Sequence, residues 1–281
     1  MPRLEASDGR KLFYLDEGQG PVVLCLAGLT RNRRDFDAVA ARLTDRFRVL
    51  RLDSRGRGGS ERALDPAAEY DLMVETGDAL HLLDTLGIAR AAVIGTSRGG
   101  LLAGLMASLR PGLLGAVAVN DIGPRVEMAG LRRIAGYVGG GPAATFQTAA
   151  EGFRSANEDR FPGIPLSRWL THAHATYDDD GGRPVFAYDP ALAEVTRAGV
   201  EGQAGDHIDA SAAFAGLAAT PLLVIRGARS DILSADTAQA MVAGRDDAAV
   251  VEVADRGHAP FLDEPEVVAA LDPFLDRYAA P

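Results

Sequence analysis

The chain has 281 residues, of which 47% are hydrophobic and 24% are charged, a composition typical of a globular protein with one large domain or a domain carrying an insertion. Its formal net charge of −10 argues against nucleic acid or an anionic membrane as the main partner, because both require a basic surface. No signal peptide or apolar run of membrane-spanning length is visible, so we expect a cytoplasmic protein. Cys25 is the only cysteine, which excludes an internal disulfide, and we expect it to be buried.

In chain order, the first predicted element is a hairpin around Asp8 and Gly9. Six nearly continuous apolar runs follow, as is typical of strands buried on both faces, at 22–28, 48–53, 91–96, 115–121, 221–227 and 249–255. Helical patterns separate or follow them at 35–46, 71–87, 100–110, 235–244 and 264–278. The alternation predicts the α/β class, with a mostly parallel central sheet and helices on both faces.

One region breaks this alternation. Residues 124–219 contain helical and glycine-rich sequence without a convincing buried strand. We interpret them as a helical lid inserted into a core domain made of 1–123 and 220–281, because a structureless loop of that length is implausible in a compact domain. Residues 137–144 and 177–184 are the predicted loops or hinges of the lid. Its aromatic side chains, including Trp169, are expected to contribute to an apolar pocket over the carboxyl edge of the sheet.

The stretch "VIGTSRGGLLAGL", residues 93–105, carries the most specific motif. Gly95-Thr96-Ser97-Arg98-Gly99 is G-x-S-x-G, and it follows a predicted strand and opens a predicted helix. In such a turn only glycine-sized residues at 95 and 99 let strand and helix approach, and the serine hydroxyl is exposed at the carboxyl edge of the sheet. The pattern predicts Ser97 as a nucleophile.

A nucleophilic serine needs a histidine base and an acid, expected after later strands in the order acid, then histidine. His258 follows the last predicted strand, and Asp231 follows the one before it. We therefore predict Ser97 as nucleophile, His258 as general base and acid, and Asp231 as the group that orients the imidazole. Asp121 also stands at a strand end and is the alternative acid; if Asp231 has that role, Asp121 would instead tie the first loop of the lid.

The other histidines are not expected to be catalytic or to bind metal. His81 lies in a helical pattern, His207 lies in a polar segment, and His172 and His174 point away from each other on a helix. A dinucleotide cofactor is not implied either, because the third glycine of a G-x-G-x-x-G pattern in "GRGGSE" would fall on Glu61. We expect neither a metal nor a cofactor.

With these motifs in place, the sequence resembles the α/β-hydrolase superfamily over essentially its whole length. "LAGLTRNRRDF" resembles the family's oxyanion loop, with Ala27 in place of the usual histidine and Gly28 retained. "LDSRGRGGS" resembles the D-x-R-G-x-G-x-S segment of lidded members, and "GHAPFLDEPEVV" resembles the surroundings of the catalytic histidine. The resemblance implies an oxyanion hole formed by the backbone N–H groups of Leu29 and Arg98.

The expected activity is acyl transfer to water, on a small ester, a lactone or the C–C bond of a ring-cleavage diketone. Haloalkane and epoxide hydrolysis are disfavoured, because the resembling enzymes use an aspartate nucleophile where this chain has Ser97. Two alternatives stay open. One is a small-ligand receptor or near-inactive pseudo-hydrolase that retains the triad, and the other is a cofactor-free oxygenase or perhydrolase on the same fold.

Arg98 and Trp169 are the candidate substrate-binding side chains. Arg98 is unusual because relatives commonly have an apolar or aromatic residue after the nucleophile. Its guanidinium suits a carboxylate. Either it pairs with a protein carboxylate, such as Asp121 or one in the lid, or it binds a carboxylate on an anionic small-molecule substrate.

Overall fold

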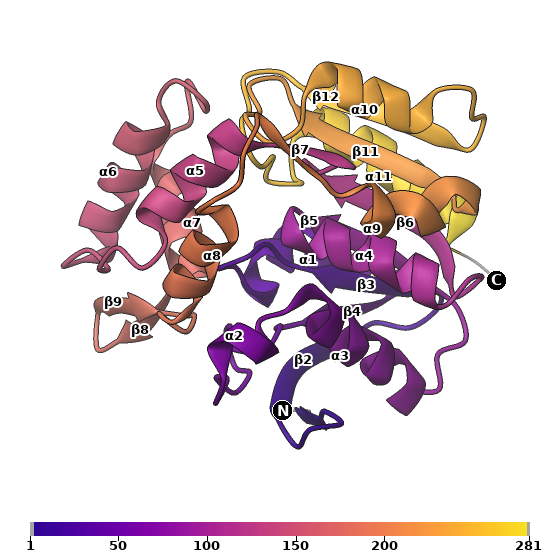
Figure 1. Ribbon diagram of the computed structural model, residues 1–281, viewed down its shortest axis with the longest axis horizontal. Helices are drawn as coiled ribbons and strands as arrows, with labels where there is room; N and C mark the ends of the chain where they lie inside the picture. Colours follow the sequence, from indigo (N-terminus) through magenta and orange to yellow (C-terminus); the bar gives the residue numbers. More distant parts are fainter. Residues whose placement is uncertain (1–2, 280–281) are drawn as a thin grey trace.

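The computed structural model describes residues 3–279 and contains a central eight-stranded sheet (Figure 1). The strand order is β1-β2-β4-β3-β5-β6-β11-β12. The bounds are β1 Arg3–Glu5, β2 Lys11–Glu17, β3 Val22–Leu26, β4 Arg48–Leu52, β5 Ala91–Thr96, β6 Leu114–Asn120, β11 Leu222–Gly227 and β12 Ala248–Val253. In this spatial order, every neighbouring pair from β4 onward is parallel. β1 and β2 form the antiparallel hairpin predicted around Asp8 and Gly9, and β2 pairs with β4 in the antiparallel direction.

The six apolar runs all form strands, and five of them, β3, β4, β5, β6 and β11, are buried almost throughout as predicted, whereas the edge strand β12 is partly exposed. Along β3 the side chains alternate between two separate cores, with Leu24 in one and Cys25 in the other. The first core is covered by α3 Leu72–Thr85, α4 Arg98–Leu109 and α10 Ala235–Val242, and the second by α1 Asp37–Leu43 and α11 Pro265–Tyr278. This two-faced burial explains why the strand sequences lack the alternation of a half-exposed sheet.

The segment between β6 and β11 is mostly helical (Figure 1). It contains β7 Arg125–Glu127, α5 Met128–Tyr137, α6 Phe146–Asn157, α7 Leu166–Thr176, β8 Tyr177–Asp180, β9 Arg183–Phe186, α8 Leu192–Val200, β10 His207–Asp209, α9 Ser211–Phe214 and η2 Ala215–Ala219. β8 and β9 form a hairpin, so the prediction of a loop at 177–184 was wrong apart from the turn at Gly181 and Gly182. The hairpin could not be recognised in the sequence because β8 and β9 are short and only partly buried, so they lack the apolar runs of the central strands.

The helices of this segment lie beside the carboxyl ends of the central strands. The Asn32 amide, in the loop after β3, donates to the carbonyl of Ala175 at the end of α7. Arg34 donates to the Asp178 carboxylate at 2.7 Å. The last part of the segment differs, since α9 and η2 pack against the core helix α4. The division into a core and a lid at 124 and 219 stays a prediction.

Two short helical elements complete the fold. The 3-10 turn η1 Arg33–Phe36 precedes α1, and α2 Pro66–Glu69 precedes α3. Across residues 3–279, every helix is too short or too polar to cross a bilayer.

Candidate active site

Ser97 lies at the sharp turn between β5 and α4, as the motif predicts. Its backbone has φ 52° and ψ −116°, a conformation that non-glycine residues seldom adopt. A Cβ atom on Gly95 would overlap the backbone of Gly99, and one on Gly99 would overlap the carbonyl of Leu26. The two glycines therefore allow strand and helix to approach closely enough to hold Ser97 in this strained turn.

His258 reaches Ser97 from the loop after β12. Its Nε2 lies 2.9 Å from Ser97 Oγ, a hydrogen-bonding distance. The Asn120 amide, at the end of β6, donates to the carbonyl of Pro260 at 3.0 Å and holds this loop against the sheet. The structure thus brings together the serine and the histidine that the sequence paired.

The acid beside the histidine is Asp121, and the prediction of Asp231 was wrong. Asp121 Oδ2 lies 2.8 Å from His258 Nδ1 and also accepts a hydrogen bond from Ser230 Oγ at 2.5 Å. Its Oδ1 accepts from the backbone N–H of Gly227 at 2.8 Å. The Asp121 side chain is fully buried and its backbone φ is +60°, so this turn directs the carboxylate toward the imidazole.

Asp231 lies too far along its loop to take this place. β11 ends at Gly227, and the turn that follows carries Asp231 to α5, where it forms a two-pronged ion pair with Arg133 at 2.5 and 2.8 Å. Burial alone would raise the pKa of Asp231, but Arg133 and, to a smaller extent, His258 hold it below its ordinary value. The residue instead joins the helical segment to the core.

Two backbone N–H groups in the segments next to Ser97, those of Leu29 and Arg98, have no hydrogen-bond acceptor among the described residues. Arg98 is the first residue of α4, where a helix leaves its N–H groups free. A Cβ on Gly28 would lie 3.8 Å from Ser97 Cβ, so the loop after β3 lies against the serine. These are the groups that the family resemblance implied for an oxyanion hole.

The Arg98 side chain pairs with a protein carboxylate, although with neither of the partners considered. Its Nε and Nη2 donate to Glu75 of α3 at 3.0 and 2.9 Å, and Nη2 also donates to the carbonyl of Tyr70 at 2.8 Å. With the side chain 16% exposed, these bonds hold the Arg98 guanidinium against Glu75. Glu75 was missed, although a glutamate within the apolar pattern of 71–87 was visible in the sequence.

Trp169 lies inside the core of the helical segment. It is 2% exposed and contacts Phe161, His172 and Phe261 edge to face. Phe261 follows His258 in the chain, so the tryptophan packs against the loop that carries the histidine. In this position Trp169 offers almost no surface to a substrate, and its predicted role in substrate binding receives no support from its burial.

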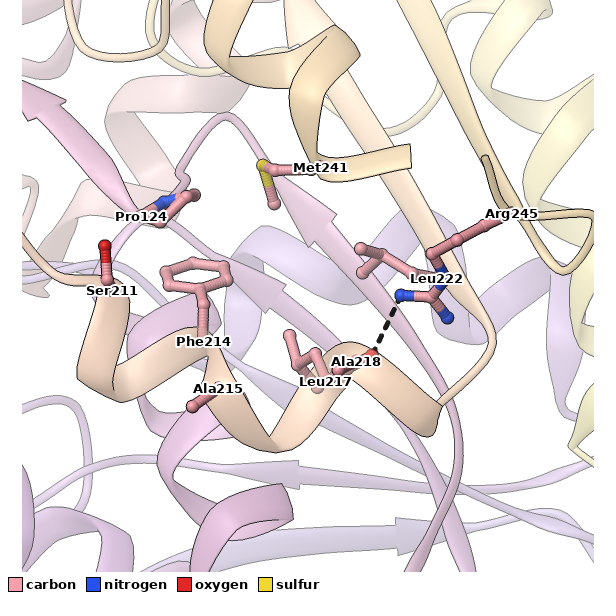
Figure 2. Close-up of a pocket in the computed structure, with 9 residues that line it drawn as sticks. All are labelled: Pro124, Ser211, Phe214, Ala215, Leu217, Ala218, Leu222, Met241 and Arg245. Atoms are coloured by element: carbon pink, nitrogen blue, oxygen red, sulfur yellow. Dashed lines mark hydrogen bonds between the residues drawn. The ribbon is translucent and has the colours of Figure 1, made fainter. Parts of the chain in front are cut away.

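A pocket of about 200 Å³ lies elsewhere in the molecule (Figure 2). Phe214 and Met241 face each other across it, and the Arg245 guanidinium beside it donates to the carbonyl of Leu217 at 2.9 Å. None of its lining residues is a candidate site residue. Within residues 3–279, no three His, Cys, Asp or Glu side chains cluster in a way that could hold a metal ion.

The fold and this strand–serine–helix turn define a class of enzyme. Residues 21–265 match the family described as alpha/beta hydrolase fold, and the chain belongs to that family. Since its named relatives are hydrolases, the protein is an α/β-fold hydrolase.

Its similarity to particular proteins extends over nearly the whole chain. It is 32% identical to the 3-hydroxybutyrate-oligomer hydrolase of Cupriavidus necator over 92% of this chain and 90% of that protein. It is 28% identical to the 2-(acetamidomethylene)succinate hydrolase of Mesorhizobium japonicum over 93% of this chain and 90% of that protein. A crystal structure of an alpha/beta hydrolase from Novosphingobium aromaticivorans superimposes with a TM-score of 0.90 at 42% identity, covering 98% of this chain and 97% of that one.

Proposed function

We propose that the protein is a serine hydrolase of small carboxylic esters that acts through an acyl-enzyme. The observation that carries this proposal is the continuous hydrogen-bonded line from Asp121 through His258 to Ser97, with N···O distances of 2.8 and 2.9 Å. Such an arrangement is suited to moving a proton from a serine hydroxyl to an imidazole whose other nitrogen is held by a buried carboxylate.

In the proposed acylation, His258 Nε2 takes the Ser97 proton as Oγ forms a bond to the substrate carbonyl carbon. The carbonyl oxygen becomes an oxyanion that accepts hydrogen bonds from the N–H groups of Leu29 and Arg98. The tetrahedral intermediate collapses, the alcohol leaves with the proton from His258, and the acyl group stays on Ser97. In deacylation, water loses a proton to His258 Nε2 as its oxygen bonds to the acyl carbon. The bond from that carbon to Ser97 Oγ then breaks, Oγ takes the proton back from His258, and the acid is released.

The names of the relatives support a substrate that carries a carboxylate besides the scissile bond. One acts on 3-hydroxybutyrate oligomers and the other on 2-(acetamidomethylene)succinate. We propose for this chain a short ester of a hydroxy acid with a free terminal carboxylate. A lactone or a C–C substrate is the alternative within the same mechanism.

The placement of Arg31 supports an anionic substrate. A Cβ on Gly28 would lie 3.4 Å from Arg31 Cγ and 3.8 Å from Ser97 Cβ, so the arginine starts beside the nucleophile. Its guanidinium hydrogen-bonds to Asp35 and to the hydroxyl of Thr176 in α7. Arginine has five N–H donors, and these partners leave some of them free for a carboxylate.

A substrate screen on the wild type and Ser97→Ala tests the proposal. Wild type should hydrolyse the linear 3-hydroxybutyrate dimer, and Ser97→Ala should lose at least about 10³-fold in kcat with its fold retained. A Ser97→Ala variant with near wild-type activity would contradict the serine mechanism. Uniformly slow turnover of esters, lactones and ring-cleavage diketones, with tight binding of one of them, would favour a receptor, and substrate-dependent oxygen uptake would favour an oxygenase.

The carboxylate preference has its own control. The dimer and its terminal amide have the same single ester bond and differ in the terminal charge, and loss of one charge-assisted bond is worth about 1.5–3 kcal/mol. Arg31→Met should therefore lower kcat/KM for the dimer by roughly 10- to 100-fold more than for its amide. Equal losses on the two substrates would refute the assignment of Arg31.

A further inference from the structure

Three charged side chains form a buried unit beneath the nucleophile turn. Glu75 of α3, whose side chain is 1% exposed, accepts hydrogen bonds from two arginines. Its Oε1 accepts from Arg57 at 2.8 Å and from Arg98 at 2.9 Å, and its Oε2 accepts from Arg98 at 3.0 Å. Arg57 itself comes from the loop after β4 and is fully buried.

Each arginine is also attached to one half of the proposed oxyanion hole. Arg57 Nε donates to the carbonyl of Leu29 at 2.8 Å and so fixes the loop that carries the Leu29 N–H. Arg98 supplies the second N–H from its own backbone, and its side chain returns to Glu75. Glu75 therefore joins the arginine that holds the loop of Leu29 to the arginine that carries the second N–H.

The charges in this unit do not cancel. Burial alone would raise the pKa of Glu75, but Arg57 and Arg98 hold it below its ordinary value, so the carboxylate is ionised. Two guanidiniums against one carboxylate leave an excess positive charge in a buried place. Burial lowers the pKa of Arg57; Glu75 acts in the opposite direction, and the neighbouring Arg98 adds to the lowering.

We propose that Arg57, Glu75 and Arg98 are positioning residues that set the distance between the two oxyanion donors and supply a positive potential behind them. The inference rests on the proposed function, in which the N–H groups of Leu29 and Arg98 bind the oxyanion. The interaction is strongest when the oxyanion carries its full charge, so it favours the transition state over the bound ester.

The chain provides a matched control for this role. Asp78, one helical turn beyond Glu75 in α3, forms an equally buried two-pronged pair with Arg55 at 2.7 and 2.8 Å. The Arg55 side chain makes no hydrogen bond to the loop of Leu29 or to the turn of Ser97 within residues 3–279, and its one link to the unit is its backbone carbonyl, which accepts from Arg57 Nη1 at 2.6 Å. Asp78→Asn thus removes a similar buried carboxylate charge without touching the oxyanion donors.

The experiment compares Glu75→Gln, Arg57→Lys and Asp78→Asn with p-nitrophenyl butyrate as substrate and a short-chain trifluoromethyl ketone as probe of the oxyanion hole. Glu75→Gln should lower kcat by about 10- to 100-fold with KM little changed, somewhat less than complete loss of one oxyanion donor. The ketone, which Ser97 converts to a hemiketal oxyanion, should bind more weakly by a similar factor. Arg57→Lys keeps the charge but loses the fixed link to Leu29, and should lower kcat about tenfold.

Asp78→Asn should leave kcat and ketone binding within about threefold of wild type, whatever it does to Tm. Equal kcat losses in Asp78→Asn and Glu75→Gln, or a rise in KM alone, would overturn the proposal. If Glu75→Gln does not fold, Arg57→Lys decides, and an unchanged kcat in that variant would also overturn it. Failure of the serine mechanism is a separate outcome, because only that failure leaves Ser97→Ala active.

Discussion

Replacing Asp121 with asparagine should nearly abolish turnover, because the structure fixes which way the new amide must face. Gly227 donates its N–H to Asp121 Oδ1, so the carbonyl oxygen of the introduced amide has to stay on that side. The amide NH₂ group then occupies the position of Oδ2, 2.8 Å from His258 Nδ1. A donor at that place forces Nδ1 to accept, which moves the ring proton to Nε2.

An imidazole with its proton on Nε2 cannot take the proton of Ser97. Loss of the correct tautomer in such a triad lowers kcat by about 10⁴-fold, which corresponds to about 5.5 kcal/mol at 1.36 kcal/mol per tenfold change. We expect a loss of about 10³- to 10⁴-fold for Asp121→Asn. The assay is kcat for p-nitrophenyl butyrate, with Tm measured in parallel to establish that the fold is retained.

Asp231→Asn is the control variant. The Asp231 side chain is 26% exposed and pairs with Arg133, an interaction worth about 0–1 kcal/mol at a partly exposed site. Its kcat should stay within about threefold of wild type, because the residue makes no hydrogen bond to His258 within residues 3–279. A kcat for Asp231→Asn as low as that of Asp121→Asn would refute this reasoning.

Three further predictions concern stability and reactivity. Gly99→Ala should destabilise the protein by at least about 2 kcal/mol, because the new Cβ overlaps the carbonyl of Leu26. Gly77→Ala, in an open position of α3, should instead stabilise the protein by about 1 kcal/mol. Thermal unfolding measures both changes. Cys25, whose pKa is raised to about 12 by burial, should react with iodoacetamide at pH 8 only after unfolding, as followed by mass spectrometry. The folded-state pKa of Glu75 lies below its ordinary value of 4.5. The contribution of the ionised carboxylate to stability is therefore complete above pH 4.5 and is lost as the pH falls through the folded-state pKa. The Tm difference between wild type and Glu75→Gln should accordingly shrink below about pH 4.5.

Each of these three predictions can be contradicted by a specific result. A Tm for Gly99→Ala equal to that of Gly77→Ala would show that the turn tolerates a side chain. Rapid alkylation of Cys25 in the native protein would contradict its burial between the sheet and α1. A constant Tm difference between pH 7 and 3 would mean that Glu75 has the same pKa in the folded and unfolded chain.

The central sheet could be predicted because its signals are local. A strand buried on both faces must be apolar at every position, so the runs at 22–28 and 91–96 stand out from their surroundings. The serine turn has a local signal as well, since its motif lies within five consecutive residues, although the close contact that requires glycine at 99 is with Leu26 of the neighbouring strand β3. Hydrophobic pattern and glycine spacing therefore indicate both features directly.

The identity of the acid and of its neighbours depends on three-dimensional geometry, which the spacing of residues along the sequence does not reveal. Asp121 and Asp231 both follow strands, and only the positive φ at Asp121 and the course of the chain after Gly227 decide which reaches the imidazole. The contacts of Glu75 are harder still to predict from the sequence, because its partners Arg57 and Arg98 come from two other segments. A charged residue in an apolar helix pattern indicates a buried partner but does not say which one.

The placement of the three residues of the proposed triad has a consequence for how this chain could be redesigned. Ser97 and Asp121 precede the helical segment that begins after β6, and His258 follows it, so that segment contributes none of them. We expect that the helices α5–α8 can be exchanged for those of a relative while these three residues stay on the core part of the chain. Because Arg133 lies on α5, the incoming helix of such a chimaera would have to supply a new partner for Asp231.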